Sequence, residues 1–158
     1  MSDRSVTHDT ITIERTFNAS PARVFAAWAS SKARARWAVP RDEWESAQVS
    51  VDFRVEGREV RRFGPKGDPR YRSVTNYLDI VPDRRIIMAG TMFDSELPIS
   101  CSLATVELLE HGTATRMIYT EQAAFLDGRD TPQSRRQGWG INLDKLDAYL
   151  SADNDSVV

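Results

Sequence analysis

The stretch TEQAAFLDGRDTPQSRRQGWGINLDKLDAYL, residues 120–150, passes from the end of a strand through a loop into one amphipathic helix. In this helix Trp139, Leu143, Leu146 and Leu150 recur at i, i+4, i+7 and i+11, so they share one face. An apolar helical face needs a partner surface, and residues 49–122 are typical of a run of short strands. We therefore predict that the helix lies across a sheet. A helix across a curved sheet can leave a cavity beneath it.

The segments before this helix predict one strand, two short helices and six further strands. Residues 10–17 alternate as a half-buried strand does, and Ser20 followed by Pro21 predicts the start of a helix. A second short helix is predicted at residues 31–37. The six strands are predicted at residues 48–55, 58–64, 70–81, 84–92, 98–110 and 113–122. Short turns such as Glu56-Gly57 separate them, so we expect antiparallel neighbours.

The composition bounds the class of protein. A chain of 158 residues fits one domain spanning residues 1–158, with residues 1–9 and 151–158 as loose termini. The hydrophobic share of 41% and charged share of 28% are typical of a globular domain and exclude a disordered chain. A net charge of −2 argues against a nucleic-acid partner. Without a signal-like or membrane-length apolar run, we expect a cytoplasmic protein that does not insert into membranes.

The sequence indicates neither a metal site nor a cofactor. One cysteine, Cys101, and two histidines are too few for a Cys/His zinc site. Because Cys101 lies in the alternating run ISCSLATVEL, we expect it to be a buried small residue. No Walker, GxSxG, HExxH or CxxC motif is present. Whether the protein is an enzyme therefore stays open.

Five blocks of sequence carry a family resemblance. They are IERTFNASPARVFAAWASSKARARWAVP, DFRVEGREV, YLDIVPDRRI, SLATVEL and TEQAAFLDGRD. Their order resembles the bacterial proteins similar to the activator of Hsp90 ATPase, also labelled polyketide-cyclase-like, within the START-like (SRPBCC) superfamily. The resemblance spans about residues 11–150. It implies an α+β helix-grip fold, in which a curved antiparallel sheet of about seven strands wraps around a long C-terminal helix. It also implies a deep cavity that accommodates an apolar or aromatic molecule.

The candidate ligand-binding residues are apolar or aromatic side chains expected to face inward, together with two charged ones. Thioethers and rings adapt to varied apolar shapes, although a filled core uses the same residues. The candidates are Trp28, Phe53, Arg58, Tyr77, Met88, Met92, Met117, Tyr119, Glu121, Trp139 and Leu143. The inward parity of residues 58–64 and 70–81 stays open, since Tyr77 and Ile80 share a face only with a bulge.

The two charged candidates have alternative roles. Glu121 has the parity of Met117 and Tyr119, which places a carboxylate at the inner end of a strand. It would serve as a general acid or base, or it would pair with an arginine or reach solvent. Arg58 and Glu59 face opposite sides, so only one looks inward. An inward Arg58 would bind a ligand carboxylate, and an outward one would join a surface ion pair.

Three functions are compatible with these observations. The first is binding of a small hydrophobic or aromatic molecule between the C-terminal helix and the sheet. The second is a cyclase-like or aromatase-like acid–base enzyme that uses Glu121 with help from Tyr119. The third is a partner of an Hsp90-type chaperone, because residues 54–72 hold seven basic residues against three acidic ones. We expect a small ligand as partner, leave a homodimer open, and favour the chaperone partner least.

Overall fold

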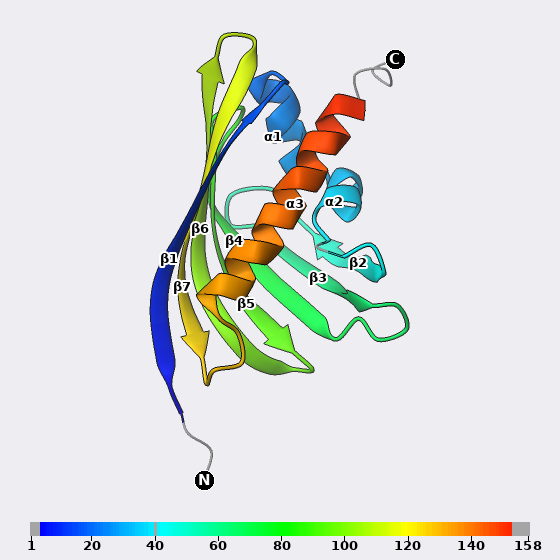
Figure 1. Cartoon of the computed structure of the whole chain (residues 1–158), viewed down its shortest axis with the longest axis vertical. Coiled ribbons are helices and arrows are strands. Elements are labelled where there is room, and N and C mark those ends of the chain that lie inside the picture. Colours follow the sequence, from blue (N-terminus) through cyan, green and yellow to red (C-terminus); the bar gives the residue numbers. More distant parts are fainter. Residues whose placement is uncertain (1–3, 40, 153–158) are drawn as a thin grey trace.

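The computed structural model describes residues 4–39 and 41–152, with the backbone alone at residues 48 and 49. Its elements are β1 (Val6–Phe17), α1 (Pro21–Ala29), α2 (Ser31–Trp37), β2 (Trp44–Val51), β3 (Arg58–Pro65), β4 (Tyr71–Val81), β5 (Arg85–Asp94), β6 (Leu97–His111), β7 (Ala114–Leu126) and α3 (Pro132–Ala152). The strands form one antiparallel sheet in the order β1-β7-β6-β5-β4-β3-β2. The sheet curves around α3, as Figure 1 shows. The predicted α+β helix-grip fold is confirmed.

Local capping explains where the helices begin. The Ser20 hydroxyl accepts a hydrogen bond from the Arg23 amide at 3.3 Å, and Pro21 occupies the first helical position. Ser30 caps α2 in the same way through the Ala33 amide at 3.1 Å. Capping thus fixes both short helices where the sequence predicts them. Pro40, which the sequence favours as the end of the second helix, lies outside the described residues.

The predicted inner face of α3 is confirmed. Leu143 and Leu146 are fully buried, Leu150 is nearly so, and Trp139 packs against the same core. The helix contacts β1, α1 and α2, and Asp144 on its outer side accepts a hydrogen bond from Arg15 of β1 at 2.8 Å. These contacts hold α3 near the β1 side of the sheet, so strands β3, β4 and β5 extend away from it (Figure 1).

Two predicted boundaries are wrong. The strand predicted at residues 48–55 is β2 at Trp44–Val51, because the chain turns at residues 52–57. There the Gly57 amide donates to the Arg54 carbonyl at 2.7 Å, and a Cβ on Gly57 would lie 2.0 Å from the Asp52 carbonyl oxygen. Only glycine fits that turn.

The predicted loose termini are also too long. Residues 6–9 belong to β1, where Val6 pairs with Leu126 of β7, and α3 continues to Ala152. Backbone pairing needs no apolar side chain, so a polar sequence such as VTHD can form an edge strand. The remaining residues of both predicted termini lie outside the described residues, except residues 4 and 5.

A bulge settles the parity of β4. The register of β4 against β5 shifts between Tyr77 and Asp79. Tyr77 is buried and Ile80 packs against the same core, so both face inward across the bulge. On β6 and β7, buried residues lie opposite each other, Val106 opposite Tyr119 and Leu108 opposite Met117.

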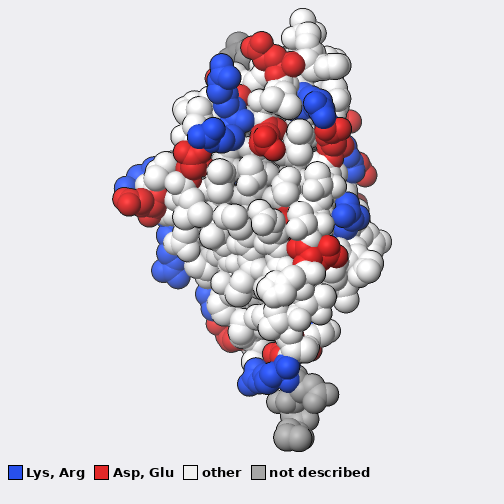
Figure 2. All heavy atoms as spheres, turned by 90° about the vertical axis from the view of Figure 1, so that its left-hand side faces the viewer, with Lys and Arg blue, Asp and Glu red and all other residues white. Residues whose placement is uncertain are grey.

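The outer face of the sheet corrects the prediction for Cys101. Ser100 and Ala104 of β6 are buried, so the residues between them alternate and Cys101 lies outward and exposed. Figure 2 shows this outer side, whose middle carries few charged side chains. Within the described parts of the chain, no helix combines the length and apolar character that crossing a membrane requires.

Candidate functional site

A cavity of about 360 Å³ lies between α3 and the inner faces of strands β3 to β6. A row of small inward-facing residues explains its presence. Thr75, Gly90, Ser102 and Ala123 are successive cross-strand partners on β4, β5, β6 and β7. The first three border the cavity. Because protein interiors are otherwise close-packed, this row of small side chains leaves space that larger residues would fill.

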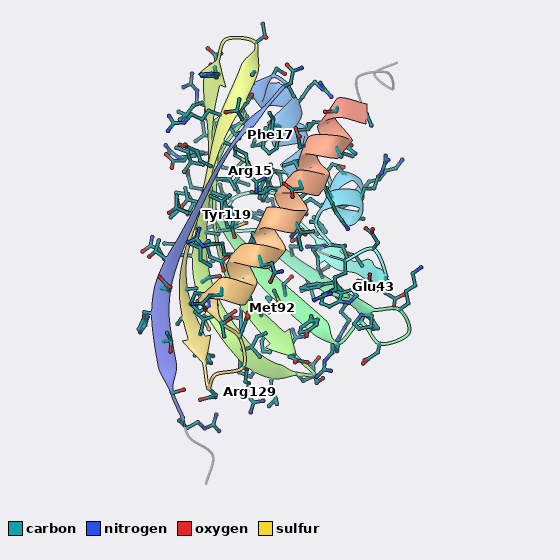
Figure 3. The ribbon with its side chains drawn as sticks, viewed as in Figure 1. Arg15, Phe17, Glu43, Met92, Tyr119 and Arg129 are labelled. Atoms are coloured by element: carbon teal, nitrogen blue, oxygen red, sulfur yellow. The ribbon has the colours of Figure 1, made fainter. Side chains whose placement is uncertain are left out.

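Three aromatic side chains form the wall of the cavity on the helix side. Trp28 of α1 stacks on Trp139 of α3, with ring centroids 5.7 Å apart and an interplanar angle of 18°. Tyr119 of β7 lies 4.3 Å from the Trp139 ring. Figure 3 shows Tyr119 and Met92 on the side of the sheet that α3 covers. Trp139 therefore contributes both to core packing and to the cavity wall.

A second aromatic group lines the cavity at the β2 edge of the sheet. Trp44, Phe63 and Tyr71 come from β2, β3 and β4 and are only partly buried. The Trp44 and Tyr71 rings stack with centroids 5.3 Å apart, and Phe63 lies 5.7 Å from Tyr71. Partly exposed aromatic rings on this side provide an apolar border where the cavity meets solvent.

Glu121 belongs to a charged group that we call the Arg135 centre, formed by Arg135, Glu121, Asp130, Tyr119 and Ser100. Arg135 of α3 donates to one Glu121 oxygen and to Ser100, and reaches Asp130 at 2.8 Å. The Tyr119 hydroxyl donates to the other Glu121 oxygen at 2.9 Å. Both carboxylate oxygens are therefore engaged, and the arginine pairing that the sequence left open is present.

The pKa values in the Arg135 centre follow from these contacts. Burial alone would lower the pKa of Arg135, but Glu121 and Asp130 overcome it, and the net shift is upward. Burial, followed by the negative charge of Glu121, raises the pKa of Tyr119 well above its usual value. Tyr119 thus keeps its proton as a donor. Each charged group of the centre thus has an oppositely charged partner within it, and the centre links the start of α3 to the sheet.

A second charged group, which we call the Arg61 centre, consists of Arg61, Arg34, Glu59 and Tyr77. Arg34 of α2 donates through both terminal nitrogens to Glu59 of β3, one of them at 2.8 Å. Arg61 donates to the Ala38 carbonyl and the Ser46 hydroxyl, both at 3.1 Å. All four members border the cavity.

The electrostatics of the Arg61 centre differ from those of the Arg135 centre. Burial, reinforced by the positive charge of Arg34, lowers the pKa of Arg61 to about 10. Burial raises the pKa of Tyr77 to about 12, so this phenol is neutral at pH 7. Burial also opposes the charge on Arg34, yet hydrogen bonding to Glu59 leaves its pKa raised. The negative charge of Glu59 therefore stabilises the charge on Arg34 more than the charge on Arg61.

Most of the predicted ligand-binding residues border the cavity. These are Trp28, Phe53, Tyr77, Met88, Met92, Tyr119, Glu121 and Trp139. Arg58, Met117 and Leu143 do not. Arg58 is exposed because Glu59 takes the inward position on β3, and Met117 and Leu143 are fully buried in the packed core. These three residues therefore do not line the cavity, contrary to the prediction.

Sequence reasoning missed the charged partners and the aromatic residues at the β2 edge. Glu59, Arg61 and Phe63 share inward parity on β3, a signal that becomes readable only once one of them is known to face inward. Arg34 was predicted only as part of a helix, and nothing in the run SRR identifies Arg135 as the partner of Glu121.

The basic segment at residues 54–72 is largely paired. Four of its arginines contact acidic side chains, and Arg61 is buried. The pairs are Arg54 with Asp52 at 2.8 Å, Arg62 with Glu96 at 3.1 Å, Arg70 with Asp94 at 2.6 Å and Arg72 with Glu96 at 3.0 Å. Most of the positive charge in this segment therefore has an acidic side chain beside it.

Comparison with known families identifies the family of the chain. Residues 18–151 match the model of the family described as activator of Hsp90 ATPase homolog 1-like protein. The chain belongs to this family. The resemblance that the sequence blocks carry is thus confirmed. No curated protein matches the sequence.

Solved structures of similar proteins agree with this membership in the activator of Hsp90 ATPase homolog 1-like family. The Mll3558 protein from Rhizobium loti is 46% identical, with 92% of this chain and 99% of that chain covered and a TM-score of 0.83. An uncharacterised protein from Rhizobium leguminosarum is 36% identical, with 95% and 99% covered and a TM-score of 0.84. Protein CV1439 from Chromobacterium violaceum, at 24% identity, 89% and 96% coverage and a TM-score of 0.79, shares the fold.

Proposed function

We propose that this protein binds a small apolar or aromatic molecule in the cavity beneath α3. The observation that carries the proposal is the cavity itself, about 360 Å³ within an otherwise packed interior and bordered by aromatic and thioether side chains. Its volume lies within the range of about 300–1,000 Å³ that is common for small-molecule pockets. The fold of the family is compatible with this role.

The cavity walls offer both apolar surface and a few polar groups. Removing apolar ligand surface from water contributes about 25 cal/mol per Å². Trp28 Nε1 and Asn142 Oδ1 are buried without a hydrogen-bond partner among the described residues, and both residues border the cavity. Both atoms are enclosed by protein, so we expect the affinity for a ligand to come mainly from the apolar walls.

The contacts of the Arg135 centre favour binding over acid–base catalysis. A general acid or base must exchange its proton with the substrate, and Glu121 already accepts from Tyr119 and Arg135 on its two oxygens. The pairing of the arginines in residues 54–72 likewise gives a chaperone partner no free basic patch among the described residues. Neither alternative has an observation of its own in its favour.

A neutral fluorescent probe tests the proposal. N-phenyl-1-naphthylamine brightens in apolar surroundings, and we expect saturable binding of one probe per chain. Ser102→Phe places a ring in the cavity and should weaken probe binding about tenfold or more, a loss of roughly 1.4 kcal/mol or more. Thr105→Phe, on the outer face of the same strand, is the matched control and should bind as the unmodified protein does.

The outcome that would contradict the proposal is equally concrete. Probe binding that does not saturate, or that Ser102→Phe leaves unchanged in a protein with native circular dichroism, would show that the cavity is not the binding site. Native mass spectrometry of the freshly purified protein adds a second readout, in which a bound small molecule appears as a discrete mass increment that the Ser102→Phe protein lacks.

A further inference from the structure

Arg61 is a cation on the cavity wall with no matching carboxylate. Its side chain is only 9% exposed and borders the cavity. Glu59, the nearest acidic residue of its group, is bound through both oxygens by Arg34. In the part of the chain that the structure describes, no carboxylate lies within ion-pairing distance of Arg61. The Arg61 centre therefore carries two cations and one anion.

The hydrogen bonds of Arg61 are also incomplete. Both described bonds use one terminal nitrogen and end on neutral acceptors, the Ala38 carbonyl and the Ser46 hydroxyl. The Nε atom is buried without a partner among the described residues. A guanidinium group presents five N–H donors in a planar fork that matches a carboxylate. The other terminal nitrogen has no hydrogen bond among the described residues, so part of the donor capacity of Arg61 is unused.

A purely structural role does not explain this arrangement. Buried charges are costly unless they are paired, and Arg34 and Arg135 in the same cavity wall both have carboxylate partners. Arg61 differs from them only in lacking one. An anion would give Arg61 the missing partner, and the cavity beside Arg61 has room for one.

Building on the proposed function, we infer that the natural ligand is an apolar or aromatic carboxylic acid whose carboxylate binds Arg61. Its apolar body would lie against the cavity-lining residues Tyr77, Phe53 and Met88. This inference specifies the ligand class that the cavity alone leaves open.

A matched pair of ligands tests the inference. 2-Naphthoate and 2-naphthamide have the same ring system and differ in charge, and each is titrated against bound N-phenyl-1-naphthylamine at pH 7.5. We expect the acid to displace the probe at a concentration about tenfold or more below that of the amide. Arg61→Gln should abolish this preference, which is measured for each variant as the ratio of the two displacement constants, each corrected for the probe affinity of that variant. Arg61→Lys should keep part of it, because lysine retains the charge without the fork.

Arg58→Gln is the control, since Arg58 is the exposed arginine on the same strand and should not affect the preference. Equal displacement by acid and amide in the unmodified protein overturns the inference, whatever the folding of the variants. So does a preference that survives in folded Arg61→Gln or Arg61→Met protein. If sodium chloride displaces the probe at the same concentration as 2-naphthoate does, Arg61 binds inorganic anions and the inference is overturned. If the unmodified protein does not bind the probe at all, the proposed function is overturned, and not merely the ligand class.

Discussion

The two buried arginine groups of this cavity solve the same physical problem differently. In the Arg135 centre, one guanidinium faces two carboxylates and a hydroxyl, and Glu121 also accepts from Tyr119. In the Arg61 centre, two guanidinium groups share one carboxylate, and Glu59 is taken by Arg34. In the first group the guanidinium has two carboxylate partners and one negative charge is in excess, whereas in the second group one positive charge is in excess.

The pKa values express the same difference. The carboxylates of the Arg135 centre raise the pKa of Arg135 in spite of burial, whereas burial and Arg34 lower the pKa of Arg61 to about 10. At about 1.4 kcal/mol per pKa unit, this lowering disfavours the charged form of Arg61 by on the order of 3 kcal/mol. A completed ion network serves stability, whereas an incomplete one next to a cavity is available for a ligand.

The largest expected effect comes from breaking the complete network. Arg135→Met leaves the buried Glu121 and the partly buried Asp130 without a cation, and we expect the free energy of unfolding to fall by about 3–5 kcal/mol. Urea denaturation followed by tryptophan fluorescence measures it. Arg136→Met is the matched control, because Arg136 is exposed and bonds only a backbone carbonyl, so a change of about 1 kcal/mol or less is expected.

The comparison would fail if both arginine variants lost the same stability. A loss below about 1 kcal/mol for Arg135→Met would mean that the Arg135 centre does not stabilise the protein, and the contrast with the Arg61 centre would disappear. That result would also reopen an active role for Glu121.

A double-mutant cycle sharpens the comparison at the Arg61 centre. Glu59→Gln removes the one carboxylate facing two buried cations, so we expect a loss of about 3 kcal/mol in unfolding free energy. Adding Arg61→Met removes the excess cation and should restore about 1–2 kcal/mol of that loss, since the two residues are coupled. Strictly additive effects in urea denaturation would contradict electrostatic coupling between Glu59 and Arg61.

The sequence was sufficient for most of the fold because the fold depends on periodic patterns. The spacing of Leu143, Leu146 and Leu150 predicts the buried face of α3, and Ser20 with Pro21 predicts the start of α1. The boundaries failed where backbone geometry overrides side-chain pattern. Residues 52–55 were predicted to continue the strand, yet hydrogen bonds around Gly57 make them part of the turn. The prediction that Cys101 is buried was wrong because it rested on a short apolar run, which did not show which residues face outward.

The candidate site was predictable in its apolar part and at Glu121, but not in its ion pairs. Parity on β7 placed Tyr119 and Glu121 inward together, whereas the parity of β3 offered Arg58 or Glu59 without a means to choose. Partners such as Arg34 and Glu59 lie 25 positions apart and belong to different elements, so no spacing rule joins them. A filled and an open interior also use the same residue types, and the cross-strand row from Thr75 to Ser102 appears only with the register.

The smallest expected effect is the most diagnostic for the Arg61 centre. Arg61→Met replaces an uncompensated buried cation with an apolar side chain of similar length, and such replacements are often neutral or stabilising. We expect the unfolding free energy of the ligand-free protein to stay the same or rise by about 1 kcal/mol, in contrast to the loss in Arg135→Met. Thermal or urea denaturation of delipidated protein measures it, with Arg58→Met as the exposed control on β3. A loss above about 2 kcal/mol would mean that the bonds from Arg61 to Ala38 and Ser46 outweigh its unpaired charge, and that Arg61 is a structural residue like Arg135.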